Sequence, residues 1–238
     1  MNISNLGPFT LAGDHLQDLV HHPDPDIFKK AVLASSMRDR ESLVRLWLTE
    51  GIPYAFKNSA GTYDEMREWL AVRLKVQIKD VTLVGSGRIG FSMKPLVFGR
   101  EFSESSDLDL TIVNLALFES CRTDAERFAN DFSNKLIFPN NEKQEIYWKD
   151  TVARLPNIAK FGFVDTNQFP GSENYRAILN VNDTMSRLQK RLEKTKGVPA
   201  PKKITARIYR DWNDLIRRVS FNLEGARREL SKSATVIE

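Results

Sequence analysis

Two short apolar segments with unusual polar residues constrain this chain most. Residues 80–87, DVTLVGSG, are rich in β-branched side chains and end in a Gly-Ser pair, and residues 107–114 read DLDLTIVN. Both segments predict β-strands. Side chains alternate between the two faces of a strand, so Asp107 and Asp109 are expected on one face, about 7 Å apart, with the intervening leucines facing the core.

The closeness of these two carboxylates needs an explanation. Two ionised carboxylates repel each other, and they are tolerated either in solvent or with a divalent cation between them. Mg²⁺ suits the arrangement because it is a hard cation that takes one or two protein carboxylates together with substrate phosphates. Mn²⁺ accepts the same oxygen ligands. We therefore expect Asp107 and Asp109 to be metal ligands.

The Gly-Ser pair supplies the complementary half of a site. Gly85 allows the backbone to approach an anion closely, and Ser86 can donate from its hydroxyl and its amide. The stretch GSGRIG is expected to open a helix, whose first amides favour phosphate. A phosphate-binding turn beside a carboxylate pair predicts phosphoryl or nucleotidyl transfer, in which the metal neutralises phosphate charge and orients the attacking oxygen.

The combination of strand, Gly-Ser turn and Asp-x-Asp strand resembles the DNA polymerase β-type nucleotidyltransferase superfamily. Within it, GSGRIGFS and SDLDL are most similar to the bacterial branch of CD-NTase/oligoadenylate-synthase-like and small defence-associated nucleotidyltransferases, and GFVDTNQFPG and ITARIYRDWNDL resemble later parts of that group. The resemblance implies a Mg²⁺-dependent nucleotidyltransferase that moves a nucleoside monophosphate from a nucleoside triphosphate to a hydroxyl acceptor and releases pyrophosphate. It also implies a role in antiviral (phage) defence or nucleotide signalling.

The same resemblance assigns the site residues. It implies that Asp107 and Asp109 are the metal-binding and catalytic pair and that Gly85 and Ser86 bind the triphosphate; we add Arg88 and Ser106 to the predicted nucleotide-binding set. Active members carry a third carboxylate on a later strand. Asp165 is our candidate, ahead of Asp150 and Asp211, although a turn aspartate in this position can instead cap the next segment. Without a third carboxylate, the chain would be an inactive nucleotide- or protein-binding module of toxin–antitoxin type.

Basic residues provide candidate contacts to phosphates or to the acceptor. Twenty residues separate Ser86 from Asp107, and the loop between them carries Lys94 and Arg100. These two cations are candidate contacts, and the alternative is that they are solvated loop charges. Residues 187–228 hold 13 Lys/Arg and 4 Asp/Glu, in a chain of net charge +4. This basic C-terminal patch, with Arg207 and Arg210, predicts an RNA or nucleotide acceptor. Two alternatives are arginines paired within the protein, and a nucleic-acid-binding protein without turnover.

The periodicity predicts an α+β fold, with a small mixed sheet, N-terminal helices and a C-terminal strand and helix. Residues 1–25 read as an irregular segment and 26–238 as one domain, with its core at 80–165 and its basic part at 187–230. The expected helices are 26–50, one that begins with a capping box at Thr62, 115–135, 174–193 and 213–230. Further strands are expected at EIYW (145–148), KFGFV (160–164) and 204–212.

The remaining features bound location and chemistry. The single cysteine, Cys121, excludes an intrachain disulfide and indicates a reducing compartment and a core position. No stretch approaches eighteen apolar residues and no signal peptide is apparent, so we expect a cytoplasmic protein without a membrane partner. The sequence does not indicate an oligomeric state.

Overall fold

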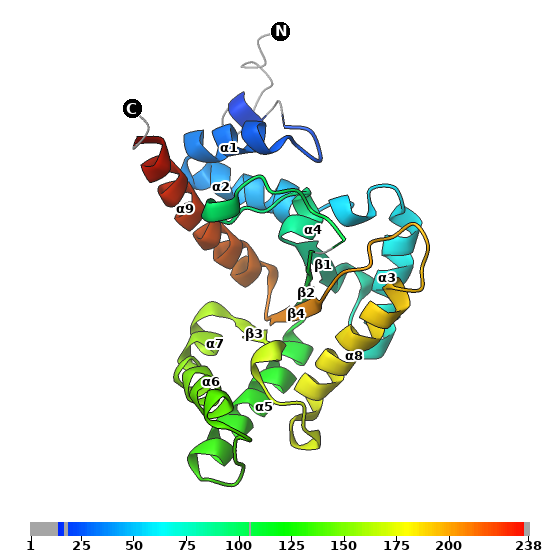
Figure 1. Cartoon of the computed structure of the whole chain (residues 1–238), viewed down its shortest axis with the longest axis vertical. Helices are drawn as coiled ribbons and strands as arrows, with labels where there is room; N and C mark the ends of the chain where they lie inside the picture. The colour runs from blue at the N-terminus through cyan, green and yellow to red at the C-terminus, as the bar shows by residue number, and fades with distance from the viewer. Residues whose placement is uncertain (1–13, 17–18, 105, 236–238) are drawn as a thin grey trace.

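A four-stranded mixed sheet lies at the centre of the computed structural model, which describes residues 14–16, 19–104 and 106–235 (Figure 1). Its strands are β1 (Val81–Val84), β2 (Leu108–Val113), β3 (Phe163–Asp165) and β4 (Ile204–Tyr209), in the order β1-β2-β4-β3. Strand β2 runs parallel to β4, and the two outer pairings are antiparallel. The mixed sheet and its surrounding helices confirm the predicted α+β class.

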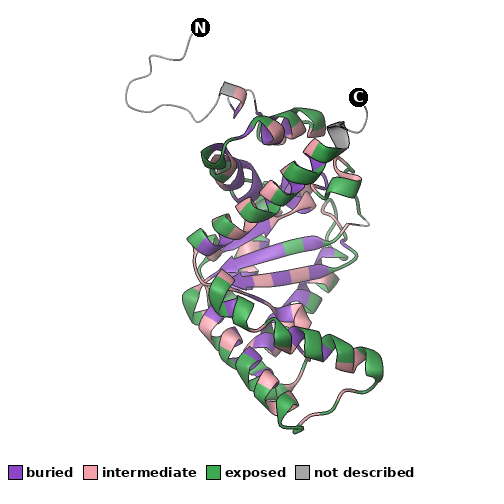
Figure 2. Cartoon of the chain, turned by 90° about the vertical axis from the view of Figure 1, so that its left-hand side faces the viewer, coloured by how far each residue is buried: buried purple, intermediate pink, exposed green. Residues whose placement is uncertain are grey.

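Helices α3 (Ala60–Leu74), α5 (Leu115–Ser133) and α8 (Arg176–Leu192) build the main core with one face of the sheet. Along α8 the buried residues recur at steps of three and four, which gives the helix one apolar stripe; they are Ile178, Val181, Met185, Leu188 and Leu192. Most strand residues are buried, whereas Asp109 of β2 is exposed and β3 and β4 contain half-buried positions (Figure 2). Cys121 lies in this core as predicted, and burial raises the pKa of its thiol to about 12.

A second apolar cluster joins the N-terminal helices to the C-terminal helix. Helices α1 (Pro25–Ala34) and α2 (Met37–Leu43), with the π-helical turn η3 (Val44–Thr49), pack against α9 (Trp212–Thr235). The first turns of α9 pack against the second face of the sheet through Leu215, beside Val113 and Tyr209. Helix α9 therefore links the sheet to the N-terminal helices, as Figure 1 shows.

Two N-terminal expectations need correction. The single helix expected over 26–50 is broken at Ser35 and Ser36, because Ser36 begins α2 with a capping box that it shares with Asp39. The capping box expected at Thr62 is wrong, since α3 already begins at Ala60 and its N-cap, Ser59, makes no side-chain cap bond. Most of the predicted irregular segment 1–25 lies outside the described residues.

The EIYW segment is also not a strand. It lies within α6 (Glu142–Ala153), which Asn141 caps, and only its tryptophan is buried. The KFGFV expectation is partly confirmed, since α7 (Pro156–Phe161) ends at Gly162 with φ +64° and β3 follows. The remaining elements are short: η2 (Asp14–Leu16), η4 (Tyr54–Phe56), η5 (Ile78–Asp80), α4 (Ser86–Ile89), η6 (Pro95–Val97), η7 (Thr166–Gln168) and η8 (Glu173–Tyr175).

No helix in the described part of the chain combines the length and the apolar composition needed to cross a lipid bilayer.

Candidate functional site

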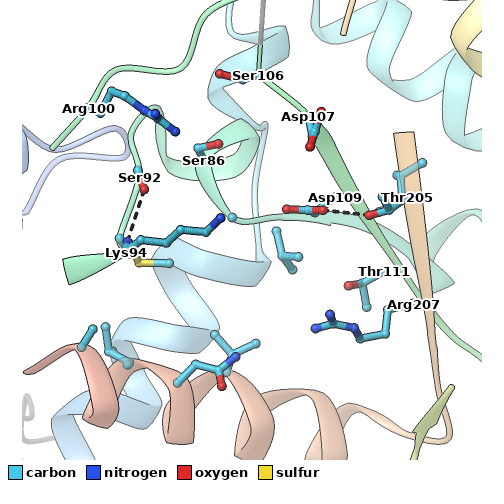
Figure 3. A pocket seen from close by; sticks show the side chains of 18 of the residues that line it. Ser86, Ser92, Lys94, Arg100, Ser106, Asp107, Asp109, Thr111, Thr205 and Arg207 are labelled. Carbon is cyan, nitrogen blue, oxygen red and sulfur yellow. Dashed lines mark hydrogen bonds between the residues drawn. The ribbon is translucent and has the colours of Figure 1, made fainter. Parts of the chain in front are cut away.

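A pocket of about 980 Å³ lies over the second face of the sheet. Its walls come from the end of β1, the start of α4, the loop 92–106, strands β2 and β4, and the inner side of α9. The predicted residues that line it are Gly85, Ser86, Lys94, Arg100, Ser106, Asp107, Asp109, Asp165 and Arg207. Sequence segments far apart in the chain thus meet in one cavity (Figure 3).

The two aspartates lie as the strand period predicts. Asp107 immediately precedes β2 and Asp109 lies within it; both are exposed to the pocket, whereas Leu108 and Leu110 are buried in the main core. The Asp109 carboxylate accepts a hydrogen bond of 2.8 Å from the Thr205 hydroxyl.

The Gly-Ser turn lies beside this pair. Gly85 has φ 68° and ψ −152°, a conformation that is open essentially only to glycine. A Cβ atom at Gly85 would lie 3.2 Å from Oδ2 of Asp109, so the turn and the carboxylate are in close contact. Ser86 begins α4, as predicted, and lines the pocket. The structure therefore brings the two halves of the predicted site together.

The loop between the motifs is held in a defined shape. The Ser92 amide donates to the Arg100 carbonyl over 2.8 Å, and Phe91 and Glu101 form an isolated β-bridge. In Figure 3 the side chains of Lys94 and Arg100 extend from this loop toward Ser86. Both cations are exposed to solvent and also line the pocket, where they can reach a bound anion.

Asp165 lines the same pocket, but on the far edge of the sheet. Its carboxylate accepts a 3.1 Å hydrogen bond from Nη2 of Arg207. Burial opposes the charge on Arg207, yet Tyr209 and Asp165 outweigh this effect and raise its pKa. Because β4 lies between β2 and β3, the Cα atoms of Asp165 and Asp109 are roughly 12 Å apart. The position beside Asp109 on β4 belongs instead to Thr205.

The weaker alternatives for the third carboxylate do not reach the pocket. Asp150 pairs with Arg154 on α6, and Asp211 pairs with Arg210. Among the described residues, no group of three or more His, Cys, Asp or Glu side chains is arranged to hold a metal ion. Asp107 and Asp109 thus offer two carboxylates, which fits Mg²⁺ if phosphate oxygens and water complete its coordination.

The placement of Arg88 is corrected by the structure. Its side chain is fully buried and donates to the backbone carbonyls of Glu50 and Leu46, away from the pocket. Burial lowers the pKa of its guanidinium to about 10. Arg88 therefore connects α4 to the end of η3 and does not face the predicted phosphates.

The predicted basic patch is not one surface. Arg210 and Arg217 both pair with Asp214, whose side chain is fully buried, and Arg210 does not line the pocket. Arg227 and Arg228 pair with Glu224 on α9. These α9 contacts match the alternative in which arginines pair within the protein. Arg207 and Tyr209 share the pocket face, although Tyr209 is buried.

Thr205, Lys202 and Asn222 are among the pocket residues that the sequence analysis missed. Thr205 follows from strand alternation, since residues 205, 207 and 209 share a face. Lys202 precedes that strand, and Asn222 lies on the inner side of α9. No sequence pattern singles out Asn222.

Comparison of the chain with protein-family models, with curated proteins and with solved structures gives no match.

Proposed function

We propose that the chain is a divalent-metal-dependent nucleotidyltransferase that transfers a nucleoside monophosphate from a nucleoside triphosphate to a hydroxyl acceptor. One observation carries the proposal: the Gly85–Ser86 turn contacts Asp109 in a pocket that also holds Asp107 and two loop cations. An anion-binding turn and a carboxylate pair have opposite ligand preferences. A metal-bound phosphate chain satisfies both at once.

Each residue has a separate task in this proposal. The backbone at Gly85 and the Ser86 hydroxyl bind the terminal phosphates, and Lys94 and Arg100 neutralise their charge. Asp107 and Asp109 hold Mg²⁺ or Mn²⁺, which when bound would polarise the phosphates and orient the attacking oxygen. The Thr205 hydroxyl fixes the orientation of the Asp109 carboxylate.

The proposed reaction is a displacement at the α-phosphorus. A bond forms between the acceptor oxygen and the α-phosphorus, and the bond from the α-phosphorus to its bridging oxygen breaks. Pyrophosphate leaves with the electron pair of that bond, and the acceptor proton passes to a base. The pocket of about 980 Å³ is at the upper end of the range for small-molecule sites, so it has room for a triphosphate and part of an acceptor.

Pyrophosphate release with each of the four nucleoside triphosphates and Mg²⁺ or Mn²⁺ tests this function. We expect release with at least one triphosphate, and a loss of at least about a hundredfold in the D107N/D109N variant. The matched control is D150N/D183N, which neutralises two exposed aspartates that each pair with an arginine one turn later. Equal rates for the wild type and D107N/D109N would refute the proposal.

A second candidate is a nucleotide-binding module without turnover. Two contacts favour it: a threonine hydroxyl occupies the position beside Asp109, and Arg207 holds the carboxylate of Asp165. Triphosphate binding that requires the aspartate pair, without pyrophosphate release under any condition, would support this module over the enzyme.

A further inference from the structure

The cations at the end of α8 and in the following connection form a basic region of which only Lys202 lines the pocket. Residues 190–203 hold six basic residues and one acidic residue, Glu193. We call the basic corner the set Arg73, Lys190, Arg191, Lys194, Lys196, Lys202 and Lys203. Except for Arg73, which is half-buried, all of them are exposed.

These cations differ from the arginines of α9 in their partners. Asp214 and Glu224 of α9 each pair with at least two arginines, one of which, Arg210, precedes the helix. No carboxylate lies within ion-pair distance of any basic-corner cation in the described part of the chain. The acidic neighbour Glu193 instead accepts a hydrogen bond from Gln189. The corner is therefore an uncompensated positive surface.

The spacing along α8 concentrates the charge further. Lys190 and Arg191 lie in the last turn of α8, and Lys194 follows the end of the helix at Leu192. Arg187, one turn earlier, pairs with Asp183, but these three cations have no such partner among the described residues. Cations in the last turn of a helix interact favourably with its dipole, so α8 itself accommodates Lys190 and Arg191. The positive charge that these residues and Lys194 leave without acidic partners suits an anionic partner.

Two arginines of the corner are held in place by one aromatic ring. The guanidinium groups of Arg73 and Arg191 lie 5.0 and 5.1 Å from the centre of the Trp69 ring. This arrangement joins α3 to α8 and limits the freedom of both side chains. An ordered guanidinium suits a phosphate oxygen better than a mobile ammonium does.

Two hydrogen bonds connect the basic corner to the pocket. The Gln189 side chain donates to the Lys202 carbonyl over 3.1 Å, which fixes Lys202 beside the last turns of α8. The Leu108 amide donates to the Lys203 carbonyl over 2.9 Å, one residue after Asp107. Lys202 itself lines the pocket. A chain of phosphates lying on the corner would therefore lead to the carboxylate pair.

We propose that the basic corner binds the phosphodiester backbone of a nucleic acid. The exposed cations of the basic corner contact phosphates without reading sequence. This binding stands independently of catalysis. The extension that a terminal hydroxyl of the bound strand enters the pocket as the acceptor rests on the proposed function.

Fluorescence anisotropy with labelled single-stranded RNA, single-stranded DNA and duplex DNA tests the proposal. We expect binding that weakens steeply with salt. The K190Q/K194Q/K196Q variant should bind about tenfold more weakly, or worse, at about 0.1 M salt. For single strands, the slope of the logarithm of the binding constant against the logarithm of the salt concentration should be shallower by about 2. The three arms of the experiment identify which nucleic acid is preferred.

The matched control is R154Q/R228Q/K232Q, which removes the same charge from three exposed cations that have acidic partners. It should keep the wild-type affinity and slope. Equal losses of affinity in both triple variants would show that binding depends only on the net charge of the protein, which would overturn the proposal. So would the absence of salt-dependent binding to any oligonucleotide, or binding only to vesicles of phosphatidylserine.

The measurements separate this proposal from the enzymatic one. Binding is recorded without triphosphate and repeated with D107N/D109N, which should bind at least as tightly as the wild type. If pyrophosphate release is absent but the basic-corner variant loses binding, the surface stands and the enzymatic function fails. If pyrophosphate release occurs while the basic-corner variant binds nucleic acid like the wild type, the enzymatic function stands and the basic-corner proposal fails.

Discussion

Gly85 has an unusual backbone conformation and also lies next to the Asp109 carboxylate in the pocket. Its ψ of −152° with positive φ directs the chain past Asp109, and the nearest side-chain atom to a Cβ there would be Oδ2 of that aspartate. Two requirements, an unusual conformation and free space, therefore fall on the same position. Gly85 is the residue at which the predicted site tolerates least change.

The Gly85→Ala variant should lose both stability and triphosphate binding. The positive φ is expected to cost about 1–3 kcal/mol in the free energy of unfolding, and the added methyl group displaces the Asp109 carboxylate. Urea denaturation and triphosphate titration measure the two effects. Gly61→Ala is the control, since a Cβ at this helical position meets nothing within 4 Å; it should leave both quantities unchanged or raise stability slightly. An unaffected G85A variant would contradict our account of the turn.

The sequence allowed residue positions to be predicted where a local period determines them. Strand alternation was sufficient to place Asp107 and Asp109 on one face. Arg88 was misplaced because its direction depends on η3, a contact that joins residues about forty positions apart. Arg210 was misplaced because Asp214 lies one helical turn later and attracts it. The positive charge of an arginine does not by itself indicate where the side chain of Arg88 or that of Arg210 points.

At the scale of elements, the break between α1 and α2 shows how side-chain caps decide boundaries. Ser36 accepts from the Asp39 amide, and the Asp39 carboxylate accepts from the Ser36 amide at 2.9 Å. This pair holds the pKa of Asp39 below its usual range, chiefly through the bond from the Ser36 backbone. The S-x-x-D pattern was visible in the sequence, but the apolar period that continues through it concealed the break.

The Ser36→Ala variant should lower the free energy of unfolding by about 1 kcal/mol, because it removes the cap of α2. Ser59→Ala is a matched control at the N-cap of α3, where no side-chain cap bond exists, and it should change stability by much less. Thermal denaturation of the two variants checks the difference. Equal losses would show that the capping box does not stabilise α2.

The error at EIYW has a different origin. A short run of β-branched and aromatic residues predicts a strand by composition, but Asn141 caps a helix just before it and two of its apolar side chains, Ile146 and Tyr147, are exposed. The sheet has no strand at that position, so tertiary context decided in favour of the helix. Longer elements such as α5 and α8 were predicted nearly to their ends because each has a continuous apolar stripe.

At the scale of the whole molecule, Glu224 joins the C-terminal helix to the N-terminal helices. Its carboxylate accepts from Arg227 and Arg228 on α9 and pairs with Arg40 of α2 at 3.2 Å. These partners lower the pKa of Glu224 to about 2. Helices α2 and α9 lie near opposite ends of the sequence, and no local sequence pattern indicated that they pack together.

The depressed pKa predicts how stability depends on pH. The contribution of Glu224 is fully present above its unfolded pKa of about 4.3, and it declines as the pH falls toward about 2. The Glu224→Gln variant should therefore be less stable than the wild type at pH 7, by about 1 kcal/mol because partial exposure screens the contact. The difference should shrink below pH 4.

Denaturant unfolding between pH 2.5 and 7 measures this difference. Glu145→Gln, which removes an exposed pair with Lys149 one turn away, is the control and should show little change at any pH. A constant difference between E224Q and the wild type across this range would exclude a role for the Glu224 charge.

The central claim is that Asp107, Asp109 and the Gly85–Ser86 turn bind a metal-bound triphosphate together. A crystal grown with Mn²⁺ and a non-hydrolysable nucleoside triphosphate tests it most directly through the anomalous signal of the manganese. We predict a manganese peak between the two carboxylates, with phosphate oxygens on Ser86. A triphosphate bound elsewhere, or a manganese peak away from both aspartates, would contradict the claim.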